Sequence, residues 1–197
     1  MFSSRFLKII NLSIAVLLVV VAGVVWWFAG RPLPQTSGTI SAPLSAKATV
    51  AFDAIGVPHI EAASWEDAIF VQGYLTAQER MWQMDALRRL AAGELSEVVG
   101  KVALEVDQEA RRLRLKRIAE MHERNLSNED RAVLAAYARG VNHYLETNRG
   151  KLPMEFAVLA YDPRPWSVRD TILAGLEMYR QLTTTWKDDL LKTTMLD

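Results

Sequence analysis

The stretch GYLTAQERMWQMDALRRLAAGELSEVVG at residues 73–100 decides how the chain folds. Its first two thirds contain apolar residues at spacings of three or four, which places them on one face of an α-helix. Ser64 and Asp67 form a capping-box pattern ahead of the run, and Gly93 follows it. We therefore predict a long helix over 64–92 with one buried face, ended by a glycine.

The sequence on both sides of this helix predicts a mainly α fold with a short N-terminal β-hairpin. Residues 47–62 have strand composition interrupted by a turn at Gly56, and a hairpin this small is marginal unless further strands pair with it. Downstream, we predict a loop over 95–100, helices over 107–125, 128–148 and 167–182, and the start of another helix near Trp186. Gly140 lies inside a predicted helix, where we expect a close packing contact.

The first thirty residues predict a membrane anchor. The run from Leu12 to Ala29 contains no charge and approaches the roughly 20 residues that span a bilayer. Arg5 and Lys8 precede it, which favours a cytoplasmic N-terminus and a periplasmic remainder. We expect an uncleaved inner-membrane helix at 1–30, with a cleaved signal segment and secretion to the periplasm as the alternative. Residues 31–46 are rich in Pro, Ser and Thr and predict an extended linker.

Composition excludes several classes of protein. The 197 residues carry 23 basic and 23 acidic side chains and no cysteine, which excludes a disulfide framework, a cysteine-based zinc site and a cysteine nucleophile. The basic run at 111–117 alternates with leucines and contains no aromatic residue, so we expect a solvated helix face and no nucleic-acid partner. The chain lacks a GxSxG elbow, a P-loop and a dinucleotide fingerprint. Residue patterns alone thus reveal no complete active site.

A series of motifs occurs in a fixed order along the chain. They are DAIGVPHI at 53–60, GYLTAQERMWQM at 73–84, RRLAAGELSE at 88–97, AYARGVN at 136–142 and PRPW at 163–166. In order and spacing they resemble the α-chain pattern of the penicillin acylase (penicillin amidase) family of N-terminal-nucleophile hydrolases. The resemblance implies that 47–197 is a truncated α-chain domain, part of an αββα fold.

The same resemblance implies how such a protein works. Family members are made as a precursor that cleaves itself and exposes a serine at the start of a β-chain. That serine hydrolyses linear amide bonds of N-acyl compounds such as penicillins or acyl-homoserine lactones. The nucleophile would lie beyond Asp197, so no catalytic residue is expected here, and the missing β-chain is the expected partner. The alternative is a non-catalytic, membrane-anchored helical domain that binds a partner or serves as a scaffold.

Two α-chain contributions carry over by resemblance. Tyr179, Leu182 and Thr183 occupy positions that line the acyl pocket, although family members acting on phenylacetyl groups tend to have Met, Arg and Phe there. The alternative is that Tyr179 and Leu182 are ordinary core residues. Asp189 occupies the position of a structural calcium ligand, usually glutamate, whose other ligands would come from the missing chain. No organic cofactor is expected.

Overall fold

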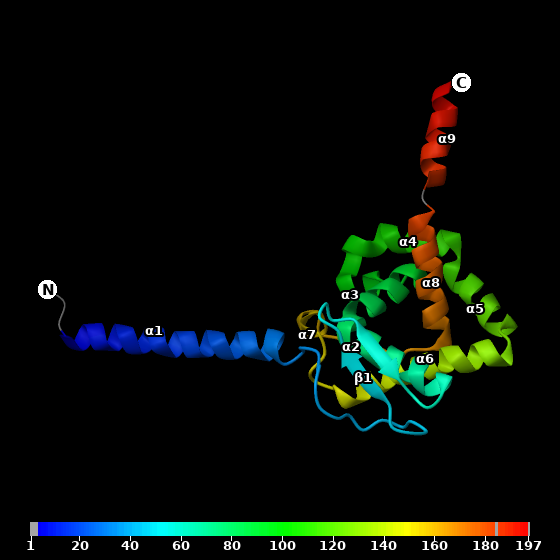
Figure 1. Cartoon of the computed structure of the whole chain (residues 1–197). Helices are drawn as coiled ribbons and strands as arrows, with labels where there is room; N and C mark the ends of the chain where they lie inside the picture. The colour runs from blue at the N-terminus through cyan, green and yellow to red at the C-terminus, as the bar shows by residue number, and fades with distance from the viewer. Residues whose placement is uncertain (1–3, 184, 197) are drawn as a thin grey trace.

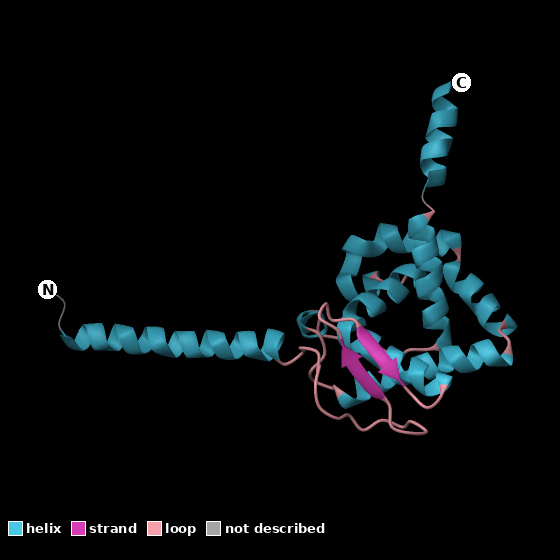
Figure 2. Ribbon diagram, in the orientation of Figure 1, coloured by secondary structure: helices cyan, strands magenta, loops and turns pink. Residues whose placement is uncertain are grey.

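The computed structural model describes residues 4–183 and 185–196. In chain order its elements are α1 (Ser4–Val25), the π-helical turn η1 (Trp26–Gly30), β1 (Thr49–Phe52), β2 (Pro58–Glu61), α2 (Trp65–Ala92), α3 (Ser96–Val99), the 3-10 turn η2 (Gly100–Ala103), α4 (Leu104–Leu113), α5 (Leu115–Asn125), α6 (Asn128–Thr147), α7 (Met154–Val158), α8 (Val168–Leu182) and α9 (Thr185–Leu196). The described chain is therefore mainly helical with one antiparallel hairpin, as predicted (Figure 2).

Helix α2 is the central element, and both of its predicted ends are confirmed. The Ser64 hydroxyl accepts a hydrogen bond from the amide of Asp67 at the start, and Gly93 ends the helix with a φ of 68°. A left-handed residue at this position is the usual glycine stop of a helix. The buried face of α2 includes Phe70, Tyr74, Ala77, Met81, Met84 and Arg88, all placed there by the sequence pattern.

Helices α2 and α6 pack with their backbones in close approach. A Cβ atom added at Gly140 would collide with the carbonyl oxygen of Phe70, and one added at Gly73 would collide with that of Tyr137. Each glycine thus lies against the backbone of the other helix. The close contact expected at Gly140 is confirmed. The main core forms around this pair; among its buried members are Met81, Val141, Tyr144, Phe156 and Trp166.

The predicted hairpin is present. Strands β1 and β2 pair antiparallel, with Thr49 opposite Glu61 and Phe52 opposite Pro58. The Asp53 carboxylate accepts the amides of Ile55 and Val57 across the turn. In the described part of the chain no further strand pairs with this hairpin.

The prediction for residues 95–125 is partly wrong. Residues 96–99 form helix α3, and the expected single helix over 107–125 is divided by Arg114, which has a φ of 56°. The buried Asp107 carboxylate explains the compact turn, because it accepts the amides of Leu95 at 2.9 Å and Ser96 at 2.8 Å. The break also leaves Leu113 partly exposed to solvent.

The two ends of the chain project from the helical body in different directions (Figure 1). Helix α1 with η1 contains a candidate membrane span, Leu7–Gly30, with a mean hydropathy of 2.7 and no buried residues. At the other end, α9 extends beyond α8 (Figure 1).

Candidate functional site

The last turn of α8 carries the three residues expected to line an acyl pocket. Tyr179 is 69% exposed and Leu182 is 78% exposed, and the two lie three residues apart, on the same side of the helix. The hydroxyl of Thr183 donates to the carbonyl oxygen of Tyr179 at 2.8 Å, which closes the helix end. Within this chain the alternative that Tyr179 and Leu182 are core residues is wrong. The helix end presents an aromatic and an aliphatic side chain to whatever covers it.

Asp189 lies on α9, one element beyond this helix end. Its side chain is 71% exposed and approaches Lys192 only loosely, at 3.8 Å. Across the described residues there is no cluster of three or more acidic or histidine side chains suited to a metal. Calcium takes six to eight oxygen ligands. Asp189 can therefore supply one carboxylate, but the other ligands would have to come from outside the described residues.

The orientation of α8 is fixed at its base by a buried ionic network centred on Asp85. Asp85 accepts from Nε of Arg88 at 2.9 Å, from Nε of Arg89 at 2.8 Å and from the hydroxyl of Tyr161 at 2.7 Å. Burial alone would raise the pKa of this carboxyl. The charge of Arg88 and the hydrogen bonds from Tyr161 and both arginines outweigh burial and lower the pKa.

Arg88 connects this network to α8. Its guanidinium is fully buried and reaches Asp170 in the first turn of α8 at 3.3 Å. It also donates to the carbonyl oxygens of Arg164 and Pro165, just before that helix. Asp170 in turn completes a capping box with Ser167. Arg88 of α2 thus ties the start of α8 to the central helix.

The motif at 88–97 contains only part of this network. It includes Arg88, Arg89 and Glu97, and Arg89 contacts Glu97 at 3.2 Å. The centre of the network, Asp85, lies between this motif and the one at 73–84. Its position three and four residues before the two arginines was an available signal, because such spacings bring charges together on a helix. Tyr161 had no comparable signal, since it is 76 residues away in sequence.

A second buried acid lies in the far half of α8. Glu177 is fully buried and accepts from Arg180 at 2.9 and 2.6 Å and from Gln181 at 3.1 Å. Hydrogen bonding to the Glu177 carboxylate raises the pKa of Arg180. These partners all belong to α8, so the bonds stabilise the last turns of the helix from within it.

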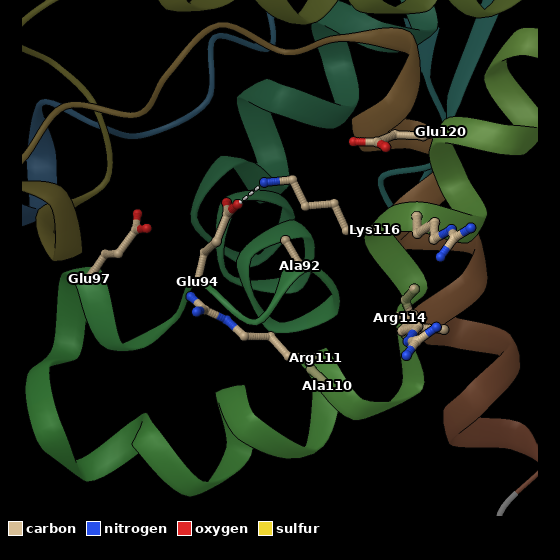
Figure 3. A pocket seen from close by; sticks show the side chains of 10 residues that line it. Ala92, Glu94, Glu97, Ala110, Arg111, Arg114, Lys116 and Glu120 are labelled. Atoms are coloured by element: carbon tan, nitrogen blue, oxygen red, sulfur yellow. Dashed lines mark hydrogen bonds and ion pairs between the residues drawn. The ribbon is translucent and has the colours of Figure 1, made fainter.

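A cavity of about 520 Å³ opens between α4, α5 and the turn after α2 (Figure 3). Several of the charged side chains that line it form hydrogen bonds or ion pairs with other groups of the protein. Arg111 donates to the carbonyl oxygen of Gly93 at 2.8 Å, and Lys116 donates to Glu94 at 2.6 Å. Two cations of the basic run at 111–117 therefore stabilise the corner between α2 and α5. The cavity shows no arrangement of nucleophile and base.

Comparison with known proteins identifies the family. A family model described as penicillin amidase matches residues 47–197, which is most of the chain. The chain belongs to the penicillin amidase family. The buried network and the exposed end of α8 are thus features of a penicillin amidase domain.

Individual relatives agree with this assignment. The chain is 40% identical over 156 residues to acyl-homoserine lactone acylase QuiP of Pseudomonas aeruginosa, covering 77% of this chain and 18% of that protein. It is 38% identical over 135 residues to penicillin acylase 2 proenzyme of a Pseudomonas species, covering 68% and 17%. A solved thermostable penicillin G acylase from Alcaligenes faecalis superposes with a TM-score of 0.63 at 28% identity, covering 70% and 74%. The chain spans less than one fifth of the curated relatives it matches.

Proposed function

We propose that this chain is the α-chain region of an acylase that hydrolyses the linear amide bond of N-acyl compounds, such as penicillins or acyl-homoserine lactones. The family membership supports a hydrolase of this type, and the matched relatives are named for both substrate classes. The nucleophilic serine would lie beyond Asp197, in a β-chain released by cleavage of the precursor. That chain would also supply the strands that complete an αββα fold around the β1–β2 hairpin.

The coverage of the relatives supports a separate α-chain. The same region covers only 18% of QuiP but 74% of the solved acylase chain. The solved chain is thus much shorter than QuiP and similar in size to this one. One relative is also named a proenzyme.

The proposed reaction requires no group from this chain at the reacting bond. The serine Oγ would attack the amide carbonyl carbon while its own α-amino group accepts the hydroxyl proton. With a pKa near ~8, that amine is suited to proton transfer near neutral pH. The proton then passes to the leaving nitrogen as the C–N bond breaks, and water hydrolyses the acyl-serine ester.

This chain would form one wall of the acyl pocket. The observation that carries this role is the exposed end of α8, where Tyr179 and Leu182 are solvent-facing. The base of the same helix is held by the buried ion pair between Arg88 of α2 and Asp170. A rigid helix end with exposed apolar side chains suits contact with an acyl chain, because such pockets need preorganised apolar walls. Thr183 would be placed beside them.

Asp189 is proposed as one ligand of a structural calcium ion. Its exposed carboxylate is a hard oxygen donor of the type calcium prefers, and Lys192 neutralises it only weakly. Bound calcium would link α9 to the β-chain. In the complete protein, Asp189→Asn should lower the melting temperature in calcium and remove most of the further loss caused by a chelator. An equal chelator effect in both proteins would overturn the assignment.

The proposed location follows from the N-terminus. Leu7–Gly30 would anchor the enzyme in the inner membrane with its body in the periplasm, or direct its secretion there if the segment is removed.

The test of function uses the complete precursor and a series of N-acyl substrates of increasing chain length. Leu182→Ala should change the ratio of kcat/KM between long and short acyl chains by about tenfold or more, because each methylene in a pocket is worth about 1–3 kcal/mol. Leu113→Ala, a partly exposed leucine on α4, is the matched control. An unchanged chain-length profile in Leu182→Ala would overturn the pocket assignment. Failure of the mature enzyme to hydrolyse any N-acyl substrate would overturn the function.

A further inference from the structure

The segment between the apolar helix and the hairpin, expected to be an extended linker, is fastened to the helical body. We call residues 35–46 the strap. At its far end, Ser45 donates its amide to the Asp67 carboxylate at 3.1 Å, and its hydroxyl donates to the other oxygen of the same group. At its near end, the side-chain amide of Gln78 donates to the carbonyl oxygen of Gln35 at 3.2 Å. Asp67 and Gln78 both belong to α2, so the strap runs along that helix.

The middle of the strap is held by α6. Nε2 of His143 lies 2.8 Å from the carbonyl oxygen of Ser41, and it must carry the proton because a carbonyl only accepts. The imidazole itself is fixed between Phe70 and Tyr74, with ring centroids at 5.7 and 5.8 Å. The strap therefore has three attachment points on two different helices.

The strap runs opposite to α2 in direction, from Gln78 towards Asp67. These two residues are eleven positions apart, or about 16 Å along a helix. Ten extended residues of the strap could cover about twice that distance. The strap therefore bows outward, and a cavity of about 760 Å³ separates it from β1 and α2.

The connection between the apolar helix and the strap is short and stiff. Four residues separate Gly30 from Gln35, and two of them, Pro32 and Pro34, are prolines. Arg31 continues the helix end, because its amide donates to the carbonyl oxygen of Trp26 and its guanidinium lies 3.9 Å from the ring centroid of Trp27. Five fully extended steps span at most about 18 Å, against about 60 Å if all of 31–46 were free.

We propose that the strap holds the catalytic body against the lipid surface, so that the enzyme works within a short, fixed distance of the membrane. The proposed partner of the body is a lipid bilayer. The inference rests on the uncleaved anchor of the proposed function but not on the reaction. Residues 35–46 also precede the segment matched by the family model, which begins at residue 47. Docking at the membrane is therefore inferred from this chain's own contacts.

The first experiment tests whether the strap is attached. Hydrogen exchange is measured on the complete precursor in lipid nanodiscs, wild type against Asp67→Asn. Loss of a hydrogen bond to a charged group should speed exchange of the strap amides at least about tenfold. Asp130→Asn is the matched control, since Asp130 pairs with Ser127 at the start of α6, in a separate serine–aspartate pair. Equal exchange of the strap in both variants would overturn the attachment.

The second experiment measures distance to the lipid. Because this chain has no cysteine, Glu129→Cys provides a single dye position on it, with acceptor dyes on lipid headgroups. Inserting about a dozen Gly/Ser residues between Pro34 and Gln35 adds about 20 Å of reach and should lower energy transfer at least about twofold. The same insertion at Gly150, in an exposed loop, should leave it unchanged.

The outcomes separate this inference from the proposed activity. Equal energy transfer with the two insertions would overturn a short tether. If the mature protein isolated from cells lacks residues 1–30, the anchor is removed and lipid docking is overturned. Hydrolysis of N-acyl substrates by the same preparation in detergent reports on the reaction alone. Activity with a freely moving body would therefore reject the membrane docking while keeping the function.

Discussion

Replacing Asp85 with asparagine removes the charge at the centre of the buried network while keeping the side chain's shape. The carboxylate is fully buried and accepts hydrogen bonds from two guanidinium groups and one phenol. After Asp85→Asn, the acidic partner left to Arg89 among the described residues is Glu97, whose side chain is 60% exposed. Arg88 keeps Asp170 at 3.3 Å. The variant therefore leaves two buried cations with weaker compensation.

The magnitude follows from that remaining compensation. Removing one partner of a buried ion pair costs about 3–5 kcal/mol, because the other charge stays buried. Since Asp170 still faces Arg88, we expect a loss in unfolding free energy near the lower end, about 3 kcal/mol. With a urea slope of about 1–3 kcal/mol/M, the unfolding midpoint should fall by about 1–3 M.

The assay is equilibrium urea unfolding followed by tryptophan fluorescence, with Glu66→Gln as the matched control. Glu66 also pairs with an arginine, Arg139, but both side chains are more than half exposed. Exposed pairs contribute about 0–1 kcal/mol, so the control should unfold close to wild type. If Asp85→Asn loses no more stability than Glu66→Gln, the network does not stabilise the fold as argued here.

Three further outcomes are expected. The lowered pKa of Asp85 contributes stability that is present above its unfolded value of 3.8 and is lost as pH falls through the lower folded value. In an acid titration, the stability advantage of wild type over Asp85→Asn should therefore stay constant above about pH 4 and shrink below it. Gly140→Ala should lose about 2–3 kcal/mol of unfolding free energy because the new Cβ meets the backbone of α2. The control Gly175→Ala has open space around the new Cβ and should be neutral or gain up to about 1 kcal/mol. Equal melting temperatures of the two variants would contradict the close contact. Arg114→Gly should gain about 1 kcal/mol of unfolding free energy, because glycine adopts the left-handed backbone without strain. Arg112→Gly, within α4, should lose up to about 1 kcal/mol. If the urea midpoints of both variants move in the same direction, the reasoning is refuted.

Local signals were sufficient for the elements with strong periodicity and clear ends. Helix α2 begins and ends at residues that side-chain capping and the glycine stop select, so its bounds followed from sequence. The division at Arg114 was not visible, because an arginine carries no local preference for a positive φ. It is imposed by the turn that Asp107 and Arg111 fasten to the end of α2.

In the candidate site, too, some features were predictable from the sequence and others depended on tertiary contacts. The motifs identified the family and hence placed Tyr179, Leu182 and Asp189 at candidate positions. Their exposure on a helix end, and the network of Asp85 that aims that helix, required the folded chain. The docking of residues 35–46 likewise depends on side chains of α2 and α6 that lie far away in sequence.

The sequence by itself thus determined the helical class, the hairpin, the apolar N-terminal segment and the family, because periodicity, capping and ordered motifs are local properties. Only the tertiary structure decided that the linker is a strap, that Asp85 is the centre of the core's charges, and that the end of α8 faces outward. These features depend on contacts between residues 22 to 102 positions apart. No local pattern encodes which distant polar groups will satisfy one another once the apolar faces are buried.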